Sequence, residues 1–250
     1  IIGEIAYEKS NNPVVIEDGK PGIVVEQFRK LRTSFHYLGI NATTRKKILV
    51  TSTISGEGKS FTALNLSLTL AAEGKKVVII EGDLRKPTLF KQLGLAEKEG
   101  ISNYLLGELE LDRILKPTEY PNLSIIPAGP FQDNSSALYL NEKIEVLLNA
   151  LDGLFDYIII DSAPAGLLSD AYILSPLCDA TLYVVRHKYT PKLYLKTLEQ
   201  NNRIHELKNL AIVFNGVRSR GFIKNDYGYG YSYGYGYTSA DKRNEKRVIG

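Results

Sequence analysis

Six consecutive residues, Ser55 to Ser60, have the types and the spacing that phosphate binding requires. They read Ser-Gly-Glu-Gly-Lys-Ser and lie between an expected strand and an expected helix, which is the setting of a phosphate-binding loop. The glycines let backbone N–H groups point at phosphate oxygens, and the start of the helix adds partial positive charge. Lys59 would then reach the β- and γ-phosphates of a nucleotide, and Ser60 would ligate Mg²⁺. The alternative is an incidental glycine-rich turn, because Thr53 stands where the strict pattern has its first Gly.

Acidic residues follow two further hydrophobic runs that predict strands. Asp161 ends one run, and Asp83 and Arg85 closely follow the other. An acid in this position can hold Mg²⁺ directly or through water, although Asp161 alone could cap a strand. Asp83 and Arg85 could also form a surface ion pair, which contributes little. The predicted catalytic residues are Lys59, Asp83, Arg85 and Asp161, and the predicted Mg²⁺ ligands are Ser60, Asp83 and Asp161.

Alternating strands and helices predict the fold that must position these residues. Strands are expected over residues 47–52, 76–81, 123–126, 156–161, 180–185 and 210–214, and helices over 23–39, 59–72, 167–177 and 191–207, with two or three short helices within 84–150. The expected strands are hydrophobic throughout, as strands buried on both faces are, and they alternate with helices along the chain. Both features are typical of a doubly wound, mostly parallel α/β sheet. Ligands bind such sheets beyond the carboxyl ends of the strands. The predicted fold class is therefore a doubly wound α/β sheet of the P-loop ATPase type.

The bulk composition is ordinary for a soluble globular protein of one domain plus tails. The chain has 250 residues, of which 44% are hydrophobic and 24% charged, and no apolar run approaches the roughly 18 residues of a membrane span. The single cysteine, Cys178, excludes an internal disulfide and fits a reducing compartment. Met is absent, which indicates a piece of a longer protein. Residues 1–21, polar and broken by Pro and Gly, are predicted to be a linker that follows an upstream membrane segment.

The C-terminal segment 219–250 has no aliphatic pattern that predicts a packed element. Within it, six of the sixteen tyrosines alternate with Gly or Ser, and so much Gly raises the entropic cost of ordering the chain. This segment is predicted to be a flexible tail that presents phenol hydroxyls to water. It also holds the whole net charge of +3, because residues 1–218 carry 25 charges of each sign. So small a net charge does not indicate nucleic-acid binding.

Taken together, these motifs resemble the bacterial tyrosine kinases (BY-kinases) that accompany capsule and exopolysaccharide export. The resemblance runs from about residue 22 to residue 218 and returns in the tyrosine-rich tail. The family's D-x-D-x-R motif is similar to Glu81-Gly82-Asp83-Leu84-Arg85, and its D-[ST]-P-P motif is similar to Asp161-Ser162-Ala163-Pro164, followed by Ser169-Asp170-Ala171. Glu81 and Ala163 depart from the family pattern, which leaves the metal geometry and the rate open. The resemblance implies a kinase domain over residues 22–218.

The resemblance also assigns roles to residues outside the two acidic motifs. Asn215 lies in Val-Phe-Asn-Gly-Val, where related ATPases use the Asn on the adenine. The implied ATP-binding residues are Ser55, Gly56, Glu57, Gly58, Lys59, Ser60, Phe61 and Asn215. Glu26, Arg29 and Arg32 match the E-x2-R-x2-R pattern that joins family members into a ring, although an exposed ion pair within one helix would explain them too. The implied phosphoacceptors are Tyr227, Tyr229, Tyr231, Tyr233, Tyr235 and Tyr237.

The resulting hypothesis is an ATP- and Mg²⁺-dependent autokinase. Asp83 is expected to orient the tyrosine hydroxyl and accept its proton, and Arg85 to assist at the phosphates or hold Asp83. The implied partners are further copies of the chain in a ring, a transmembrane polysaccharide co-polymerase segment, fused upstream or separate, and a tyrosine phosphatase. The expected location is the cytoplasmic face of the bacterial plasma membrane, with this piece of the chain itself soluble.

Two other functions stay open from the sequence. A partitioning-type ATPase shares the fold class, but its K-G-G-x-G-K pattern places a lysine early in the loop, and residues 52–58 contain none. A degenerate ATPase could also act as an assembly scaffold, with the tail as a docking strand. The intact set of Lys59, Ser60 and Asp161 argues against the scaffold.

Overall fold

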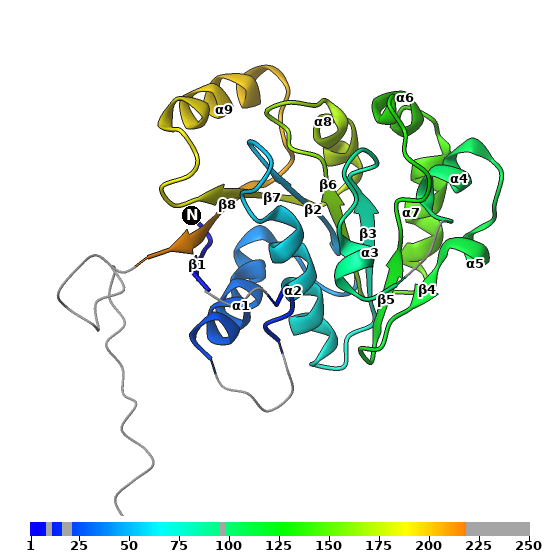
Figure 1. The fold of residues 1–250 in the computed structure, drawn as a ribbon, viewed down its shortest axis with the longest axis horizontal. Helices are drawn as coiled ribbons and strands as arrows, with labels where there is room; N and C mark the ends of the chain where they lie inside the picture. Colours follow the sequence, from blue (N-terminus) through cyan, green and yellow to red (C-terminus); the bar gives the residue numbers. More distant parts are fainter. Residues whose placement is uncertain (9–11, 17–21, 96–98, 219–250) are drawn as a thin grey trace, which may run out of the picture. The chain divides into compact units, whose positions relative to one another are not determined.

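A parallel sheet with helices on both faces makes up the compact unit from Ile1 to Val217. The computed structural model describes residues 1–8, 12–16, 22–95 and 99–218. Its strands are β1 (Gly3–Ala6), β2 (Lys47–Ser52), β3 (Val77–Gly82), β4 (Lys116–Pro117), β5 (Leu123–Ile126), β6 (Tyr157–Ser162), β7 (Ala180–Arg186) and β8 (Leu210–Val217). They follow the order β1-β8-β7-β2-β6-β3-β5-β4 (Figure 1). Every neighbouring pair is parallel except β4 with β5.

The helices connect these strands and cover the sheet (Figure 1). They are α1 (Ile23–Thr33), the 3₁₀ helix η1 (Ser34–Leu38), α2 (Lys59–Ala71), α3 (Leu89–Gln92), α4 (Ile101–Leu106), α5 (Leu111–Ile114), α6 (Ser135–Tyr139), α7 (Lys143–Asp152), α8 (Asp170–Leu174), the 3₁₀ helix η2 (Ser175–Leu177) and α9 (Lys192–Ile204). Within the described ranges, no helix is long and apolar enough to cross a membrane. The predicted doubly wound α/β fold is confirmed.

Alternation along the strands separates two hydrophobic cores. Ile48 and Val50 of β2 belong to the core that also contains buried residues of α1 and α2. Leu49, between them, belongs to the core on the other side, together with buried residues of α4, α7 and α8. Successive side chains of a strand point to opposite faces, so each central strand supplies both cores. This is why the central strands are hydrophobic throughout.

The first residues are part of the sheet, which corrects the predicted linker over residues 1–21. β1 pairs in parallel with β8, and Ile5 is fully buried. The amide of Val15 donates a 2.8 Å hydrogen bond to Oδ1 of Asn65 on α2, and Nδ2 of Asn65 donates one of the same length to the carbonyl of Pro13. The strand was missed because four residues are too short to show a periodic pattern. The described part of this segment therefore belongs to the domain.

Candidate active site

The phosphate-binding loop connects β2 to α2 and uses glycine where the backbone demands it. Gly56 and Gly58 have φ angles of 86° and 95°, in the left-handed region that glycine tolerates best. Gly58 also has a close neighbour, because a Cβ atom there would lie 2.1 Å from Nδ2 of Asn215. α2 begins at Lys59, so the loop runs directly into the helix end whose N–H groups lack intrahelical partners. The predicted strand–loop–helix arrangement is confirmed.

Lys59 lies between two buried carboxylates at the end of this loop. Its Nζ atom is 3.1 Å from Oδ2 of Asp83 and 3.6 Å from Oδ1 of Asp161. It also donates a 3.2 Å hydrogen bond to Oγ of Ser60. Asp83 and Asp161 are 5% and 1% exposed. The fold therefore brings Lys59 and the three predicted Mg²⁺ ligands together from α2, from the end of β6 and from the residue after β3.

This cluster contains two carboxylates and one ammonium group, so one negative charge is not balanced within it. Burial by itself lowers the pKa of Lys59, but the carboxylates of Asp161 and Asp83 outweigh burial and raise that pKa. Lys59 therefore stays protonated. Burial also raises the pKa of Asp161, even though the Lys59 ammonium acts in the opposite direction. The surplus negative charge lies on groups that are largely removed from water, where charge is unfavourable.

The cluster fits a magnesium ion bound together with a nucleotide. Oδ1 of Asp161 is buried and has no hydrogen-bond partner among the described residues. Mg²⁺ in such sites takes one or two carboxylates and completes its shell with water and substrate phosphates. The part of the chain that the structure describes holds no group of three or more His, Cys, Asp or Glu residues suited to a metal. Two carboxylates do not complete the shell of such an ion, so the cluster suits a cation shared with a substrate.

Arg85 is held on the same rim by a chain of polar contacts. Its Nε donates to Oγ of Ser135 at 3.4 Å, and that hydroxyl donates to Oδ2 of Asp170 at 2.6 Å. The other oxygen of Asp170 accepts a hydrogen bond from Ser136. Asp170 is fully buried, so its charge depends on these donors. Asp170 was noted in the sequence only as part of a motif, and here it links α6 and α8 to Arg85.

Glu81 does not join the Lys59 cluster, although it occupies the first acidic position of the D-x-D pattern. Its Oε1 accepts a 2.6 Å hydrogen bond from the amide of Leu89, and its Oε2 accepts a 3.2 Å bond from the amide of Ala128. The side chain is fully buried, and burial raises its pKa. Glu81 connects the start of α3 to the segment after β5. The extra methylene relative to Asp thus lets the carboxylate accept hydrogen bonds from these two backbone amides.

We expect Glu81→Gln to lower stability without changing the Mg²⁺ dependence of activity. The amide group places a donor against one of the two buried N–H groups, and an unsatisfied buried group costs about 1–3 kcal/mol. Urea unfolding and a magnesium titration of the kinase rate measure the two effects. A matched Glu108→Gln variant, at an exposed position, should change neither. A shifted Mg²⁺ dependence at unchanged stability would instead place Glu81 at the metal.

A hollow beside the phosphate-binding loop is suited to the nucleotide base and sugar. It measures about 270 Å³ and has two predicted ATP-binding residues, Phe61 and Asn215, in its wall. The other residues that line it are Ala6, Tyr7, Glu8, Asn12, Pro13, Gly58, Gln92, Arg186 and Gly216. Those between Ala6 and Pro13 were missed, because the segment was interpreted as a linker. Nothing local to the sequence marks them; the pairing of β1 with β8 and the hydrogen bonds of Asn65 to this segment bring them here.

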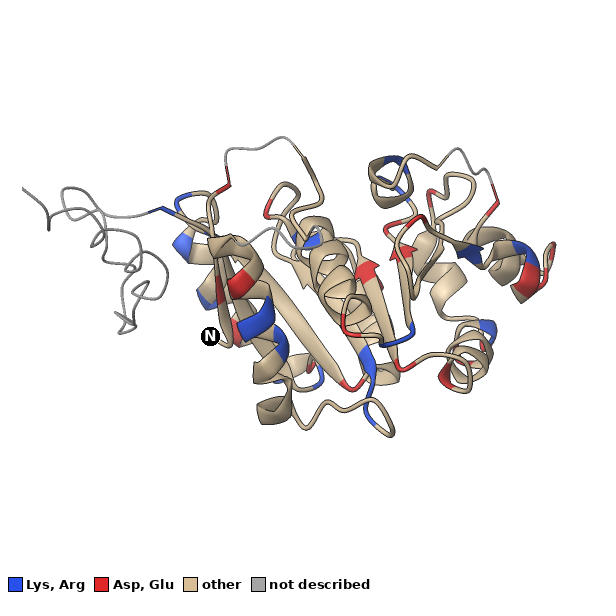
Figure 2. Ribbon diagram, turned by 90° about the horizontal axis from the view of Figure 1, so that it is seen from below, with Lys and Arg blue, Asp and Glu red and all other residues tan. Residues whose placement is uncertain are grey.

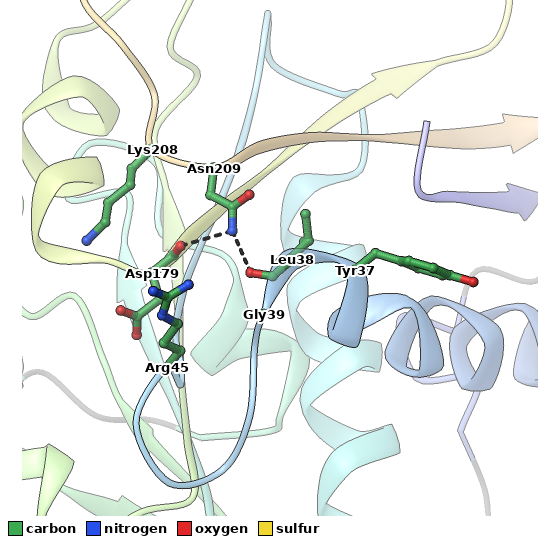
Figure 3. A pocket seen from close by; sticks show the side chains of 7 residues that line it. All are labelled: Tyr37, Leu38, Gly39, Arg45, Asp179, Lys208 and Asn209. Carbon is green, nitrogen blue, oxygen red and sulfur yellow. Dashed lines mark hydrogen bonds between the residues drawn. The ribbon is translucent and has the colours of Figure 1, made fainter.

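A further hollow lies at the opposite end of the strands. It measures about 450 Å³ and is lined by Tyr37, Leu38, Gly39, Arg45, Asp179, Lys208 and Asn209 (Figure 3). Nδ2 of Asn209 donates to the carbonyls of Leu38 and Asp179, at 2.7 and 3.3 Å. Asp179 and Asn209 directly precede β7 and β8, whereas the phosphate-binding loop follows the carboxyl end of β2. This hollow is therefore not part of the candidate active site.

The predicted assembly residues lie along α1. Glu26 and Arg29 form an ion pair with each other, and their side chains are 45% and 54% exposed. Arg32 forms an ion pair with Glu73, just beyond α2 in the same chain. Acidic and basic residues are interspersed over the described part of the chain (Figure 2). Because Glu26 and Arg29 are more exposed than Arg32, which is paired with Glu73, they are better placed to contact another molecule.

The predicted phosphoacceptors, Tyr227 to Tyr237, lie outside the described residues. All other predicted site residues are described. Ser55 to Phe61, Asp83, Arg85, Asp161 and Asn215 lie at or next to the carboxyl ends of β2, β3, β6 and β8, as the fold class requires.

Comparison with known proteins identifies the same family as these residues do. A family model described as an AAA domain matches residues 45–192. The tyrosine-protein kinase CpsD of Streptococcus agalactiae is 33% identical over 206 residues, which cover 81% of this chain and 88% of that protein. The tyrosine-protein kinase wzc of Salmonella typhi is 29% identical over 206 residues, which cover 82% of this chain but 28% of that protein. The family therefore includes much longer chains.

Solved structures agree with this result. The BceF tyrosine kinase domain superimposes with a TM-score of 0.77 at 26% identity, covering 87% of this chain and 93% of that one. The septum site-determining protein MinD of Pyrococcus horikoshii, solved with Mg-ADP, gives a TM-score of 0.55 at 25% identity and covers 68% of each chain. The closer agreement with the kinase domain favours the kinases over the partitioning-type ATPases. The chain belongs to the bacterial tyrosine kinase (BY-kinase) family, the P-loop protein-tyrosine autokinases of capsule and exopolysaccharide systems.

Proposed function

We propose that this kinase transfers the γ-phosphoryl group of ATP to tyrosines of its own C-terminal segment or of a neighbouring copy. The observation that carries the proposal is the cluster at the end of the phosphate-binding loop. There Lys59 lies 3.1 Å from Asp83 and 3.6 Å from Asp161. A buried ammonium, two carboxylates and a loop of backbone donors are the parts that phosphoryl transfer requires.

Each side chain of the cluster has a distinct role in this proposal. Lys59 pairs with the β- and γ-phosphates, and the backbone N–H groups of the loop hold their oxygens. Ser60, Asp83 and Asp161 hold Mg²⁺, which neutralises phosphate charge when bound. When Lys59 turns to the phosphates, the carboxylates that it now balances become available as metal ligands. The ammonium thus marks a position where the protein already stabilises positive charge.

The acceptor tyrosine needs a group that receives its proton. A tyrosine hydroxyl ionises near pH 10, so it reaches the site protonated. We assign proton acceptance to Asp83, whose Oδ1 already accepts a 3.0 Å hydrogen bond from the amide of Lys86. That bond fixes the carboxylate at the rim. We assign to Arg85, held through Ser135, the stabilisation of charge on the transferred group.

The hollow between β1 and the loop is assigned to the adenosine part of ATP. Asn215 contributes a side-chain amide, which suits the edge of a purine, and Phe61 and Tyr7 contribute aromatic surface. The N-terminal segment then becomes part of the nucleotide site. This assignment extends the predicted ATP-binding set by Tyr7.

The C-terminal tyrosines are assigned as acceptors because of their sequence and their reach. β8 ends at Val217, ten residues before Tyr227, and an extended chain spans about 3.3 Å per residue. The first acceptor can therefore lie some 30 Å from the sheet, enough for its own site or that of a neighbour. Each phosphate adds about −1.5 to −2 charges, so modification reverses the positive charge of this segment.

Assembly and location complete the proposal. Copies of the chain associate in a ring through α1, with Glu26, Arg29 and Arg32 at the contact. A transmembrane polysaccharide co-polymerase segment, fused upstream or separate, holds the kinase at the cytoplasmic face of the plasma membrane. A tyrosine phosphatase resets the tail. Charge repulsion between phosphorylated tails would loosen the ring and so regulate polysaccharide polymerisation and export.

We expect incubation with ATP and Mg²⁺ to add phosphate to the six tail tyrosines. A variant that lacks these tyrosines should gain no phosphate. Intact-mass measurement counts the phosphates, and a variant with Phe at all six positions should gain none while binding ATP as tightly as the parent. Loss of ATP without added mass would support a partitioning-type switch. If the chain gains no mass and consumes no ATP, the result would support a scaffold.

A further inference from the structure

The outer side of the phosphate-binding loop is bound by two strands, β7 and β8, and by the turn that follows β7. The hydroxyl of Tyr189 donates to the carbonyl of Ser55 at 3.0 Å, and Nη1 of Arg186 donates to the carbonyl of Gly56 at 2.7 Å. Nδ2 of Asn215 donates to the carbonyl of Glu57 at 2.9 Å. Three successive loop carbonyls therefore each have a side-chain donor from β7, β8 or the turn that follows β7.

Glu57 gives the loop a further attachment, which joins it to the turn between β7 and α9. Its side chain is fully buried, and its Oε2 accepts a 2.7 Å hydrogen bond from the amide of Ile54 within the loop. Its Oε1 accepts a hydrogen bond from the hydroxyl of Thr190. The Thr190 hydroxyl in turn accepts a 2.8 Å bond from the amide of Arg186. The loop is thus joined to the β7–α9 turn through backbone and side chain alike.

The turn itself is shaped to reach the loop. Lys188 has a φ angle of 57°, an uncommon conformation for a residue with a side chain. This residue reverses the chain immediately before Tyr189 and Thr190. The Arg186 guanidinium lies 5.1 Å from the centre of the Tyr189 ring, a stacking distance that favours both side chains. Arg186, Tyr189 and Thr190 are referred to below as the β7–α9 clamp.

Fixing the carbonyls has a consequence for the opposite side of the loop. A peptide unit is planar and trans, so its C=O and N–H groups point in opposite directions. When the carbonyls of Ser55, Gly56 and Glu57 are held outward by donors, the N–H groups of the following residues face the inside of the loop. That concave set of N–H groups is the one that binds phosphate.

We propose that the β7–α9 clamp positions the phosphate-binding loop, holding it in its nucleotide-binding shape before ATP arrives. This inference rests on the proposed function of the loop as the ATP site. Without the clamp, a loop rich in glycine has to be ordered at the moment of binding, and that ordering reduces affinity. Tyr189 and Thr190 act on the phosphates only through the loop, so they are positioning residues. Arg186 holds the loop as well and also lines the hollow assigned to adenosine.

The test compares variants that each remove one donor. Tyr189→Phe removes the hydroxyl bonded to Ser55, and should weaken ADP·Mg²⁺ binding about fivefold, as expected for one hydrogen bond. Thr190→Val leaves Oε1 of the buried Glu57 carboxylate without its donor, while Oε2 keeps the amide of Ile54, and should weaken ADP·Mg²⁺ binding about thirtyfold. Thr190→Ser keeps the hydroxyl and should restore binding to near the parent value. Tyr194→Phe, on α9, is the matched control, because no hydrogen bond among the described residues joins its side chain to the loop.

Calorimetric titration with ADP·Mg²⁺, steady-state kinetics and urea unfolding together decide the outcome. We expect KM for ATP to rise in the Phe and Val variants while kcat at saturating ATP is unchanged, because the loop is ordered once ATP is bound. Parent-like affinity in both variants would overturn the proposal. So would weakened binding that Ser at position 190 does not restore, or that tracks a loss of stability. Failure of the parent chain itself to bind ADP·Mg²⁺ would instead refute the proposed function.

Discussion

Lys59→Met is expected to abolish tyrosine phosphorylation and to destabilise the folded chain at the same time. For catalysis, the change removes the positive charge that meets the γ-phosphate, and loss of one such preorganised group costs about 10²–10³-fold in rate. For stability, the change removes the only ammonium that lies within 4 Å of Asp83 and Asp161 among the described residues. Removing one partner from a buried ion pair costs about 3–5 kcal/mol.

The two effects of Lys59→Met need separate measurements. Intact mass after incubation with ATP and Mg²⁺ reports the transfer, and urea unfolding of the nucleotide-free protein reports stability. Lys75→Met, at an exposed position just after α2, is the matched control and should change neither quantity. If Lys59→Met unfolds at the same urea concentration as the parent, the ammonium does not compensate the two carboxylates. The unfolding measurement shows whether a loss of activity in Lys59→Met comes from the missing ammonium or from an unstable fold.

The sequence predicted those parts of the site that are local in the chain. Strands β2 and β5 have the predicted bounds, β3 and β6 are displaced by one residue, and β7 begins as predicted but ends one residue later. Buried parallel strands are continuous hydrophobic runs, which makes them easy to recognise. Because parallel strands place their carboxyl ends on one edge, the predicted fold alone brought Lys59, Asp83 and Asp161 together. The prediction worked where one motif sits at the end of one strand.

The parts that were missed depend on contacts between distant residues. β1 is recognisable only through its pairing with β8, and the wall of the nucleotide hollow between Ala6 and Pro13 follows from that pairing. Glu81 occupies a position of the acidic motif in the sequence, yet its carboxylate accepts hydrogen bonds from the backbone amides of Leu89 and Ala128. The β7–α9 clamp acts across 130 residues or more. None of these contacts leaves a periodic or local signal.

Asp161→Asn is expected to be inactive like Lys59→Met but to shift stability in the opposite direction. The parent cluster has two carboxylates and one ammonium, and the variant has one of each, since Asp83 still lies 3.1 Å from Lys59. Burial raises the pKa of Asp161, which means that its charged form is disfavoured in the folded chain. The amide removes that charge and keeps the shape, so stability should rise by about 0.5–2 kcal/mol, typical of a single stabilising change.

The pH dependence of this gain has a definite sign. An acid whose pKa is raised on folding stabilises the fold below its unfolded pKa, and the contribution is lost as pH rises through the folded pKa. The parent should therefore lose stability relative to Asp161→Asn as pH increases from about 3.8, the ordinary value for Asp, and the difference should then level off. Urea unfolding without Mg²⁺ between pH 4 and 8 measures it. Asp112→Asn, exposed on α5, should give a curve parallel to that of the parent.

Adding ADP·Mg²⁺ should reverse the order of stability. A ligand that binds only the folded state stabilises it more the further its concentration exceeds Kd, and the parent keeps the carboxylate that we assign to Mg²⁺. The parent should therefore gain stability with ADP·Mg²⁺, whereas Asp161→Asn should gain much less and lose about 10²–10³-fold in transfer rate. A variant that is less stable than the parent at every pH would show that Asp161 contributes to the fold. A variant that retains full activity would exclude Asp161 as a ligand. Higher stability together with lost activity would identify Asp161 as a residue kept for catalysis at the expense of the nucleotide-free fold.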